Sequence, residues 1–188
     1  MASNGKFIVL EGIDGCGKTT IATLLAKKLG NTWITKEPTS ANKKIQAILR
    51  HQQSAPSPLE LQKLYIADRL SHTKKIKRIL ETRNVICQRY AMSTFAYGTA
   101  FGVSQKDLQH DFLKPDMTFL LDIPVELAMK RIAGRKQDRE YFEKKEKLAK
   151  IRKKYLALDR KKIFGKIIKI DARPAPEIIA KKILWHMR

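Results

Sequence analysis

Residues 12–19 read GIDGCGKT and form a complete G-x-x-x-x-G-K-[ST] string, the Walker A motif or P-loop. The string follows the short apolar run FIVL, which is typical of a buried strand, and precedes a helical pattern. Its glycines have no Cβ, so successive backbone N–H groups can converge on phosphate oxygens. Lys18 suits the β- and γ-phosphates, and the Thr19 hydroxyl suits Mg²⁺. The motif therefore predicts a nucleoside triphosphate site, formed by Gly12, Ile13, Asp14, Gly15, Cys16, Gly17, Lys18, Thr19 and Thr20.

Strand-like and helix-like segments alternate along the chain. Short apolar strands are predicted at residues 6–10, 33–35, 85–88, 117–122 and 166–170. Helices are predicted at residues 18–29, 41–51, 58–82, 105–113, 125–134, 140–162 and 176–186. This alternation predicts an α/β fold in which helices cover both faces of a parallel sheet. The length of 188 residues suits one domain over residues 1–188.

The composition narrows the class of protein. No stretch of the sequence approaches the roughly 20 apolar residues of a membrane span, and the first apolar run is the strand before the P-loop. The two cysteines, Cys16 and Cys87, do not form a disulfide framework, and we interpret Cys16 as a small residue that fills a variable P-loop position. We therefore expect a cytoplasmic protein with no membrane partner.

The charge is strongly basic, with 39 Lys and Arg against 18 Asp and Glu and a formal net charge of +21. Such a charge attracts polyanions, so nucleic-acid binding has to be considered. Much of the excess lies in residues 130–169, where a helical pattern would place the lysines on a solvated face. The sequence contains no zinc-ligand spacing and no aromatic residues interleaved as a base-stacking surface. We do not expect nucleic-acid binding to be the function.

Polar side chains gather where the predicted strands end. They are the P-loop itself, the string KEPT at 36–39, QRY at 88–90 and DIP at 122–124. In parallel α/β sheets, ligands bind outside the carboxyl ends of the strands. The sequence therefore predicts that these four strings border one ligand site.

Taken together, these strings resemble the thymidylate kinase family over nearly the whole chain. The matching strings, as they stand here, are FIVLEGIDG at 7–15, TKEP at 35–38, YIADR at 65–69, QRY at 88–90, STFAY at 93–97, KPD at 114–116, FLLD at 119–122 and KIDA at 169–172. The resemblance implies a P-loop nucleoside-monophosphate kinase fold with a five-stranded parallel sheet and a lid at about 134–143. It also implies transfer of a phosphoryl group from ATP to dTMP with Mg²⁺, and a homodimer.

The resemblance also implies roles for single residues. Asp14 matches an acidic position near the acceptor nucleotide and its metal, Tyr65 matches the aromatic residue that stacks on thymine, and Arg69 approaches the base edge and the monophosphate. Arg89 matches the arginine that grips the acceptor phosphate, for which a guanidinium fork is suited. Packing, an Asx turn or an exposed ion pair would be the ordinary roles of such residues. The full implied substrate-binding set is Asp14, Glu37, Tyr65, Arg69, Arg89, Ser93, Thr94 and Tyr97, with Phe95 directed into the core.

The implied lid carries cations that the P-loop lacks. No arginine stands among the variable P-loop positions, and in one subgroup of the family, the bacterial type, the lid supplies the catalytic cation instead. Arg131, Arg135, Lys136 and Arg139 lie where the resemblance places the lid. We expect Arg135 first and Arg139 second to act on the γ-phosphate, with Lys18 and Arg89 as the other catalytic residues and Thr19 and Asp14 at the metal.

Two positions depart from the family pattern. Gln88 stands where the family usually has Asp near Mg²⁺, and a neutral amide adds no negative charge to hold a dication. Either another carboxylate compensates, with Asp14 and Asp122 as candidates, or turnover is slow. Lys36 stands where Arg is common, which removes a guanidinium fork from the acceptor side.

Two other functions stay open from the sequence. One is a related kinase that uses another nucleotide or a deoxynucleoside. The other is a homologue without kinase activity that binds nucleotides or nucleic acid, with Gln88 as the mark of the lost activity. The four histidines are scattered in the sequence and suggest no metal site.

Overall fold

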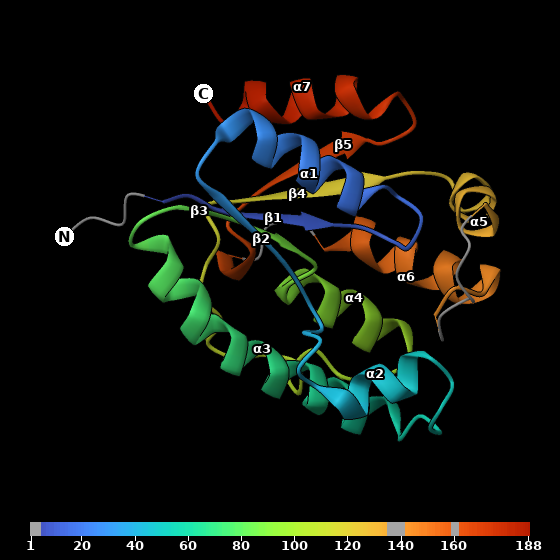
Figure 1. The fold of residues 1–188 in the computed structure, drawn as a ribbon. Coiled ribbons are helices and arrows are strands. Elements are labelled where there is room, and N and C mark those ends of the chain that lie inside the picture. The colour runs from blue at the N-terminus through green and yellow to red at the C-terminus, as the bar shows by residue number, and fades with distance from the viewer. Residues whose placement is uncertain (1–4, 135–141, 159–161) are drawn as a thin grey trace.

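The computed structural model describes residues 5–134, 142–158 and 162–188 (Figure 1). Five strands form one sheet in the order β2-β3-β1-β4-β5, and every neighbouring pair is parallel. The strands are β1 (Phe7–Glu11), β2 (Thr32–Lys36), β3 (Asn84–Gln88), β4 (Met117–Asp122) and β5 (Lys166–Asp171). This confirms the predicted five-stranded parallel α/β fold.

Helices cover both faces of this sheet. In Figure 1, α1 and α7 lie over one face and α3, α4 and α6 lie over the other, with α2 beside α3. The helices are α1 (Lys18–Leu29), α2 (Lys43–Leu49), α3 (Pro58–Leu80), α4 (Ala91–Ala100), α5 (Val125–Ala133), α6 (Lys145–Ala157) and α7 (Pro176–His186), with a 3-10 turn η1 (Lys162–Phe164) before β5. Each crossover between parallel strands requires such a covering element.

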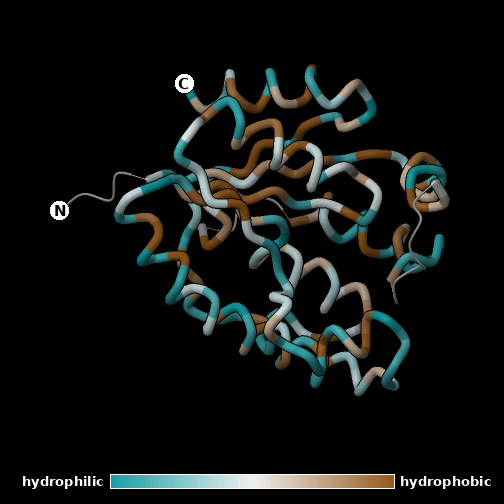
Figure 2. The backbone as a smooth tube through the Cα atoms, viewed as in Figure 1, coloured by the Kyte–Doolittle hydropathy of each residue, from teal (hydrophilic) through white to brown (hydrophobic). Residues whose placement is uncertain are grey.

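The core lies on both sides of the central strands. All residues of β1 are buried, and the tube in Figure 2 is mostly brown along the sheet and mixed along the outer helices. Strands covered on both faces read as continuous apolar runs, which is why the sequence revealed them. Within the described part of the chain, no helix combines the length and apolarity needed to cross a bilayer.

The helix predicted at residues 105–113 was wrong. The segment forms isolated turns, in which the N–H of Leu108 bonds to the carbonyl of Gln105 and that of Phe112 to the carbonyl of His110. Leu108 and Phe112 are both buried, so their i and i+4 spacing reflects two contacts with the core and no continuous helix.

A helix that was not predicted, α4, follows β3. Eight of its ten residues are buried, so its sequence shows no polar face to mark the helical period. The helix predicted at 140–162 is shorter within the described residues and spans Lys145–Ala157, and the one predicted at 41–51 spans Lys43–Leu49.

Candidate active site

The P-loop connects β1 to α1 at the carboxyl end of the sheet. Gly12 has a φ of 134°, and a Cβ there would lie 2.4 Å from the carbonyl oxygen of Leu121. The neighbouring strand β4 therefore leaves room only for glycine at this point. The Nζ atom of Lys18 donates to the carbonyl oxygens of Gly12 at 2.9 Å and Ile13 at 3.0 Å. Burial, together with the charge of Arg89, lowers the pKa of Lys18 below its ordinary value.

A cavity of about 1070 Å³, including its open mouth, lies in front of the P-loop. We call it the P-loop cavity, and it is lined by Asp14, Gly15, Gly17, Lys18, Thr19, Thr20, Lys36, Glu37, Pro38, Gln46, Leu49, Gln88 and Arg89. No side chain caps the start of α1, and uncapped backbone N–H groups at a helix start suit an anion. Ile13 and Cys16 belong to the loop, but both are buried and neither lines the cavity.

A second cavity of about 510 Å³, which we call the inner cavity, adjoins the first. It is lined by Asp14, Glu37, Pro38, Leu49, Gln62, Tyr65, Arg69, Arg89, Ser93, Thr94, Tyr97 and Phe142. All eight residues of the predicted substrate-binding set therefore lie on its wall. Tyr65 and Arg69 reach it together because residues four apart share one face of α3. Phe95 is fully buried, as expected.

Arg89 stands at the boundary between the two cavities. Its φ of 64° is unusual for a residue with a side chain, and such strain is a common property of functional sites. The guanidinium donates to the carboxylate of Asp14 and lies 5.1 Å from the centre of the Tyr97 ring. Burial lowers the pKa of Arg89, but Asp14, Tyr97, Tyr155 and Glu11 together outweigh it and hold this pKa well above the ordinary value. The tyrosine hydroxyl also donates to Asp14, at 3.3 Å.

Arg69 is held rigidly on the other side of the inner cavity. Its Nε donates to Glu37 Oε2 at 2.6 Å, and its Nη1 donates to the Thr94 hydroxyl. The guanidinium also lies 5.1 Å from the ring centres of Tyr90 and Phe112. Although burial lowers the pKa of Arg69, the carboxylate of Glu37 raises it above its ordinary value. A charge fixed in this way is ready to meet an anionic or carbonyl group of a ligand.

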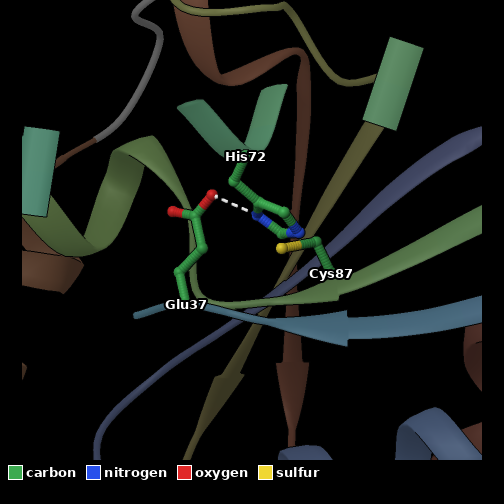
Figure 3. A group of neighbouring side chains, drawn as sticks. All are labelled: Glu37, His72 and Cys87. Atoms are coloured by element: carbon green, nitrogen blue, oxygen red, sulfur yellow. Dashed lines mark hydrogen bonds and ion pairs between the residues drawn. The ribbon is translucent and has the colours of Figure 1, made fainter. Parts of the chain in front are cut away.

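Glu37 is itself held by His72, which sequence reasoning did not connect with the site. His72 Nδ1 lies 3.0 Å from Glu37 Oε1 (Figure 3). Its Nε2 lies 2.9 Å from the Thr35 hydroxyl. Figure 3 shows the Cys87 sulfur beside the same imidazole. His72 follows Arg69 by three residues on α3, which is the spacing that could have revealed their shared face.

Glu37, His72 and Cys87 offer ligand atoms within 4.8 Å of one another, and these are atom types that bind metals. The carboxylate oxygens of Glu37 are already bonded to Arg69 and His72, and both imidazole nitrogens have partners. Burial raises the pKa of the Cys87 thiol well above its ordinary value, which opposes the thiolate that a metal needs. The arrangement therefore positions Arg69 and does not form a metal centre.

Glu11 is a second residue that sequence reasoning missed. It is fully buried at the end of β1, and its carboxylate accepts from the backbone N–H groups of Tyr90 and Ser93, the Ser93 hydroxyl and the Tyr155 hydroxyl. The carboxylate of Glu11, at the end of β1, therefore caps the start of α4, and it fixes Ser93 and Thr94 beside the inner cavity. A charged residue that ends an apolar strand was the available signal.

Gln88 contacts the P-loop directly. The Thr19 hydroxyl donates to Gln88 Oε1 at 2.8 Å, so both side chains present neutral oxygens to the P-loop cavity. Asp122, a candidate to compensate for Gln88, is instead bonded to Arg152, with Nε to Oδ1 at 2.7 Å and Nη2 to Oδ2 at 3.1 Å. Asp14 lines the P-loop cavity, so its metal role stays a prediction.

The lid predictions Arg135, Lys136 and Arg139 lie outside the described residues. Arg131 was placed wrongly in the lid. It belongs to α5, and its guanidinium donates to the carbonyls of Ala172 at 3.1 Å and Arg173 at 3.3 Å, which fastens the loop between β5 and α7. Phe142, just beyond the gap, lines the inner cavity and packs edge-on against Tyr97.

Comparisons with known proteins show which family the sequence matches. A family model described as thymidylate kinase matches residues 10–183. The chain is 42% identical over 161 residues to a probable thymidylate kinase of Methanocaldococcus jannaschii, covering 82% of each chain. It is 35% identical over 194 residues to the thymidylate kinase of Coprothermobacter proteolyticus, covering 97% of this chain and 98% of the relative.

The fold agrees as well. The structure of thymidylate kinase from Candida albicans superimposes with a TM-score of 0.82 at 24% identity, covering 97% of this chain and 90% of that one. The family model matches residues 10–183 and so extends well beyond the P-loop at residues 12–19, which alone would define only a superfamily. The chain belongs to the thymidylate kinase family.

Proposed function

We propose that the P-loop cavity holds ATP and the inner cavity holds dTMP, with Arg89 and Asp14 between the two nucleotides. Membership of the family makes phosphorylation of dTMP to dTDP the reaction of this chain, with ATP as co-substrate. The assignment of the two cavities to the two nucleotides rests on the wall that the cavities share. Asp14, Glu37, Pro38, Leu49 and Arg89 line both of them.

The reaction brings two polyanions together, so the site must supply positive charge between them. Lys18 releases its contacts with the loop carbonyls and meets the triphosphate, and Arg89 meets the phosphate of dTMP at the boundary. The acceptor phosphate oxygen is already anionic at neutral pH, so the transfer needs no general base and no covalent protein intermediate. We propose that Arg135 and Arg139 of the lid complete this charge at the γ-phosphate.

The described residues also suit Mg²⁺. Thr19 and Gln88 present hydroxyl and amide oxygens, and Mg²⁺ in kinases takes its remaining ligands from substrate phosphates and water. When bound, the ion neutralises part of the triphosphate charge. Thr19 would hold it, Gln88 would orient the hydroxyl or a water, and Asp14 would reach it only by giving up part of its contact with Arg89.

The acceptor is tested by a panel of nucleoside monophosphates and nucleosides in a coupled assay of ADP release. We expect dTMP to give the highest kcat/KM, and Lys18→Ala to abolish ADP release while dTMP still binds. A preference for another acceptor would support the related-kinase alternative. Absence of dTMP-dependent ADP release, with salt-dependent DNA binding that survives Lys18→Ala, would support the inactive homologue.

We also propose a homodimer and a cytoplasmic location, which the resemblance to the family supports. Leu70 on α3 is 41% exposed, so α3 offers an apolar contact for a second copy of this chain. Light scattering after size-exclusion chromatography should give twice the chain mass of 21.6 kDa. A mass of one chain at assay concentration would refute the dimer.

A further inference from the structure

Gln62 is a buried polar residue of the inner cavity that lies outside the strings on which the family resemblance rests. Its side chain is on α3 and is 3% exposed, and it lies on the cavity wall with Tyr65 and Arg69. Among the residues that the structure describes, its Oε1 atom is the one buried side-chain oxygen or nitrogen without a hydrogen-bond partner. A buried acceptor left unpaired costs free energy, so a partner supplied by the ligand would explain it.

Gly98 of α4 leaves room for the side chain of Gln62. A Cβ at Gly98 of α4 would lie 2.6 Å from Leu108 Cδ1 and 3.3 Å from Gln62 Cγ. The absence of a side chain at Gly98 therefore leaves the space in which the stem of Gln62 lies. The sequence pairs a glycine on α4 with a long amide side chain on α3, and the amide lies on the wall of the inner cavity.

The position of Gln62 on α3 defines which part of a ligand it can reach. Gln62, Tyr65 and Arg69 follow the spacing i, i+3 and i+7, so they share one face, and seven residues of helix span about 10 Å. Along α3, Tyr65 lies between Gln62 and Arg69, and all three line the inner cavity. A base stacked on Tyr65 would therefore meet both polar groups along one edge.

We propose that Gln62 determines the base specificity of the acceptor site by pairing with the imide edge of a thymine-type pyrimidine. This inference rests on the assignment of the inner cavity to dTMP. The imide edge presents a carbonyl, an N3–H donor and a second carbonyl. Oε1 of Gln62 accepts from N3–H and its Nε2 donates to the adjacent carbonyl, as amide side chains do in two-point recognition of bases.

Arg69 decides the orientation of that amide. A guanidinium can only donate hydrogen bonds. It can therefore donate to a carbonyl at position 4 of the base but not to the amino group that cytosine carries there. The hydroxyl of Thr94 already accepts from Arg69, and both carboxylate oxygens of Glu37 are engaged. Oε1 of Gln62 has no partner of its own and offers N3–H a free acceptor, whereas an unprotonated N3, as in cytosine, would meet this oxygen with no hydrogen between them.

The test compares kcat/KM for dTMP and dCMP in the purified full chain and in Gln62→Met, which keeps the length and removes both polar atoms. We expect kcat/KM for dTMP to fall roughly tenfold, kcat/KM for dCMP to stay the same or rise, and the dTMP to dCMP ratio to fall by about that factor. The melting temperature without nucleotide should not fall, because the change removes an unpaired buried oxygen. Gln109→Met, the same change at an exposed position outside both cavities, should change neither ratio nor stability.

Gln62→Asn serves as a second variant, because it keeps an amide but withdraws it by one methylene, and it should also lower the ratio. An unchanged ratio in a folded Gln62→Met or Gln62→Asn protein would overturn the role of Gln62, as would an equal loss for both nucleotides. A wild-type protein that phosphorylates neither dTMP nor dUMP would instead overturn the assignment of the cavity. The two failures are therefore separate.

Discussion

The buried ion pair between Arg69 and Glu37 lends itself to a quantitative test by Glu37→Ala. Both side chains are 3% exposed, and Nε lies 2.6 Å from Oε2. Removing one partner of a buried pair leaves a charge without compensation, at a cost of about 3–5 kcal/mol. The Thr94 hydroxyl and the rings of Tyr90 and Phe112 still stabilise the guanidinium, so we expect the lower end, about 3 kcal/mol.

The assay is urea unfolding of Glu37→Ala beside Glu126→Gln, which removes one carboxylate from an ion pair with Lys145 that is largely exposed. A loss of about 3 kcal/mol corresponds to a fall in melting temperature of about 6–12 °C for a chain of this size. The Glu126→Gln protein should unfold close to the wild type, because exposed pairs contribute little. Kinase assays should show a higher KM for dTMP in Glu37→Ala, since Arg69 loses its orientation. A loss below about 1 kcal/mol with an unchanged KM would refute the argument that Glu37 holds Arg69.

Three further predictions concern the metal, the lid and pH. Gln88→Asp adds a negative charge beside Thr19, so it should lower the Mg²⁺ concentration needed for half-maximal activity several-fold, and unchanged Mg²⁺ titrations would contradict this. Arg135→Ala should lower kcat by about 10²–10³, more than Arg139→Ala, with little effect on KM for dTMP, as expected for a cation that meets the transferring phosphoryl group. In steady-state kinetics, equal losses would contradict the order of the two arginines, and no loss in either would contradict their catalytic role. Burial raises the pKa of Glu11 above its ordinary value of 4.5, although its hydrogen bond from Ser93 and the charge of Arg89 oppose the shift. The folded state then holds this proton more tightly than the unfolded state, so its contribution to stability is complete below pH 4.5 and is lost as pH rises through the folded-state pKa. The free energy of unfolding of Glu11→Gln, measured from unfolding curves over a range of pH, should lack this pH-dependent loss. If the pH profiles of the variant and the wild type were parallel, Glu11 would not be the source of the loss.

Much of the fold was readable because periodicity and apolar runs are local properties. The strands predicted at 6–10, 85–88 and 117–122 agree with β1, β3 and β4 within one residue, since strands buried on both faces are continuously apolar. Helix α4 was not predicted because its burial on all sides removes the polar face that marks a helix. The helix predicted at residues 105–113 was wrong for the opposite reason. Leu108 and Phe112 have the spacing of a helical period, but each is buried without a continuous helix between them.

The sequence by itself identified the P-loop and the family strings, and it predicted the acceptor set whose residues line the inner cavity, because each of these is a short run with its own chemistry. Only the tertiary structure decided which of these residues contact one another. Arg89 was known to follow a strand, but its contact with Asp14 requires β3 to lie beside β1. Glu11 at α4, His72 behind Glu37, and Gln62 opposite Gly98 likewise bring together residues far apart in the chain. Such pairings depend on burial and on which elements are neighbours, and these arise only when the chain packs around its sheet.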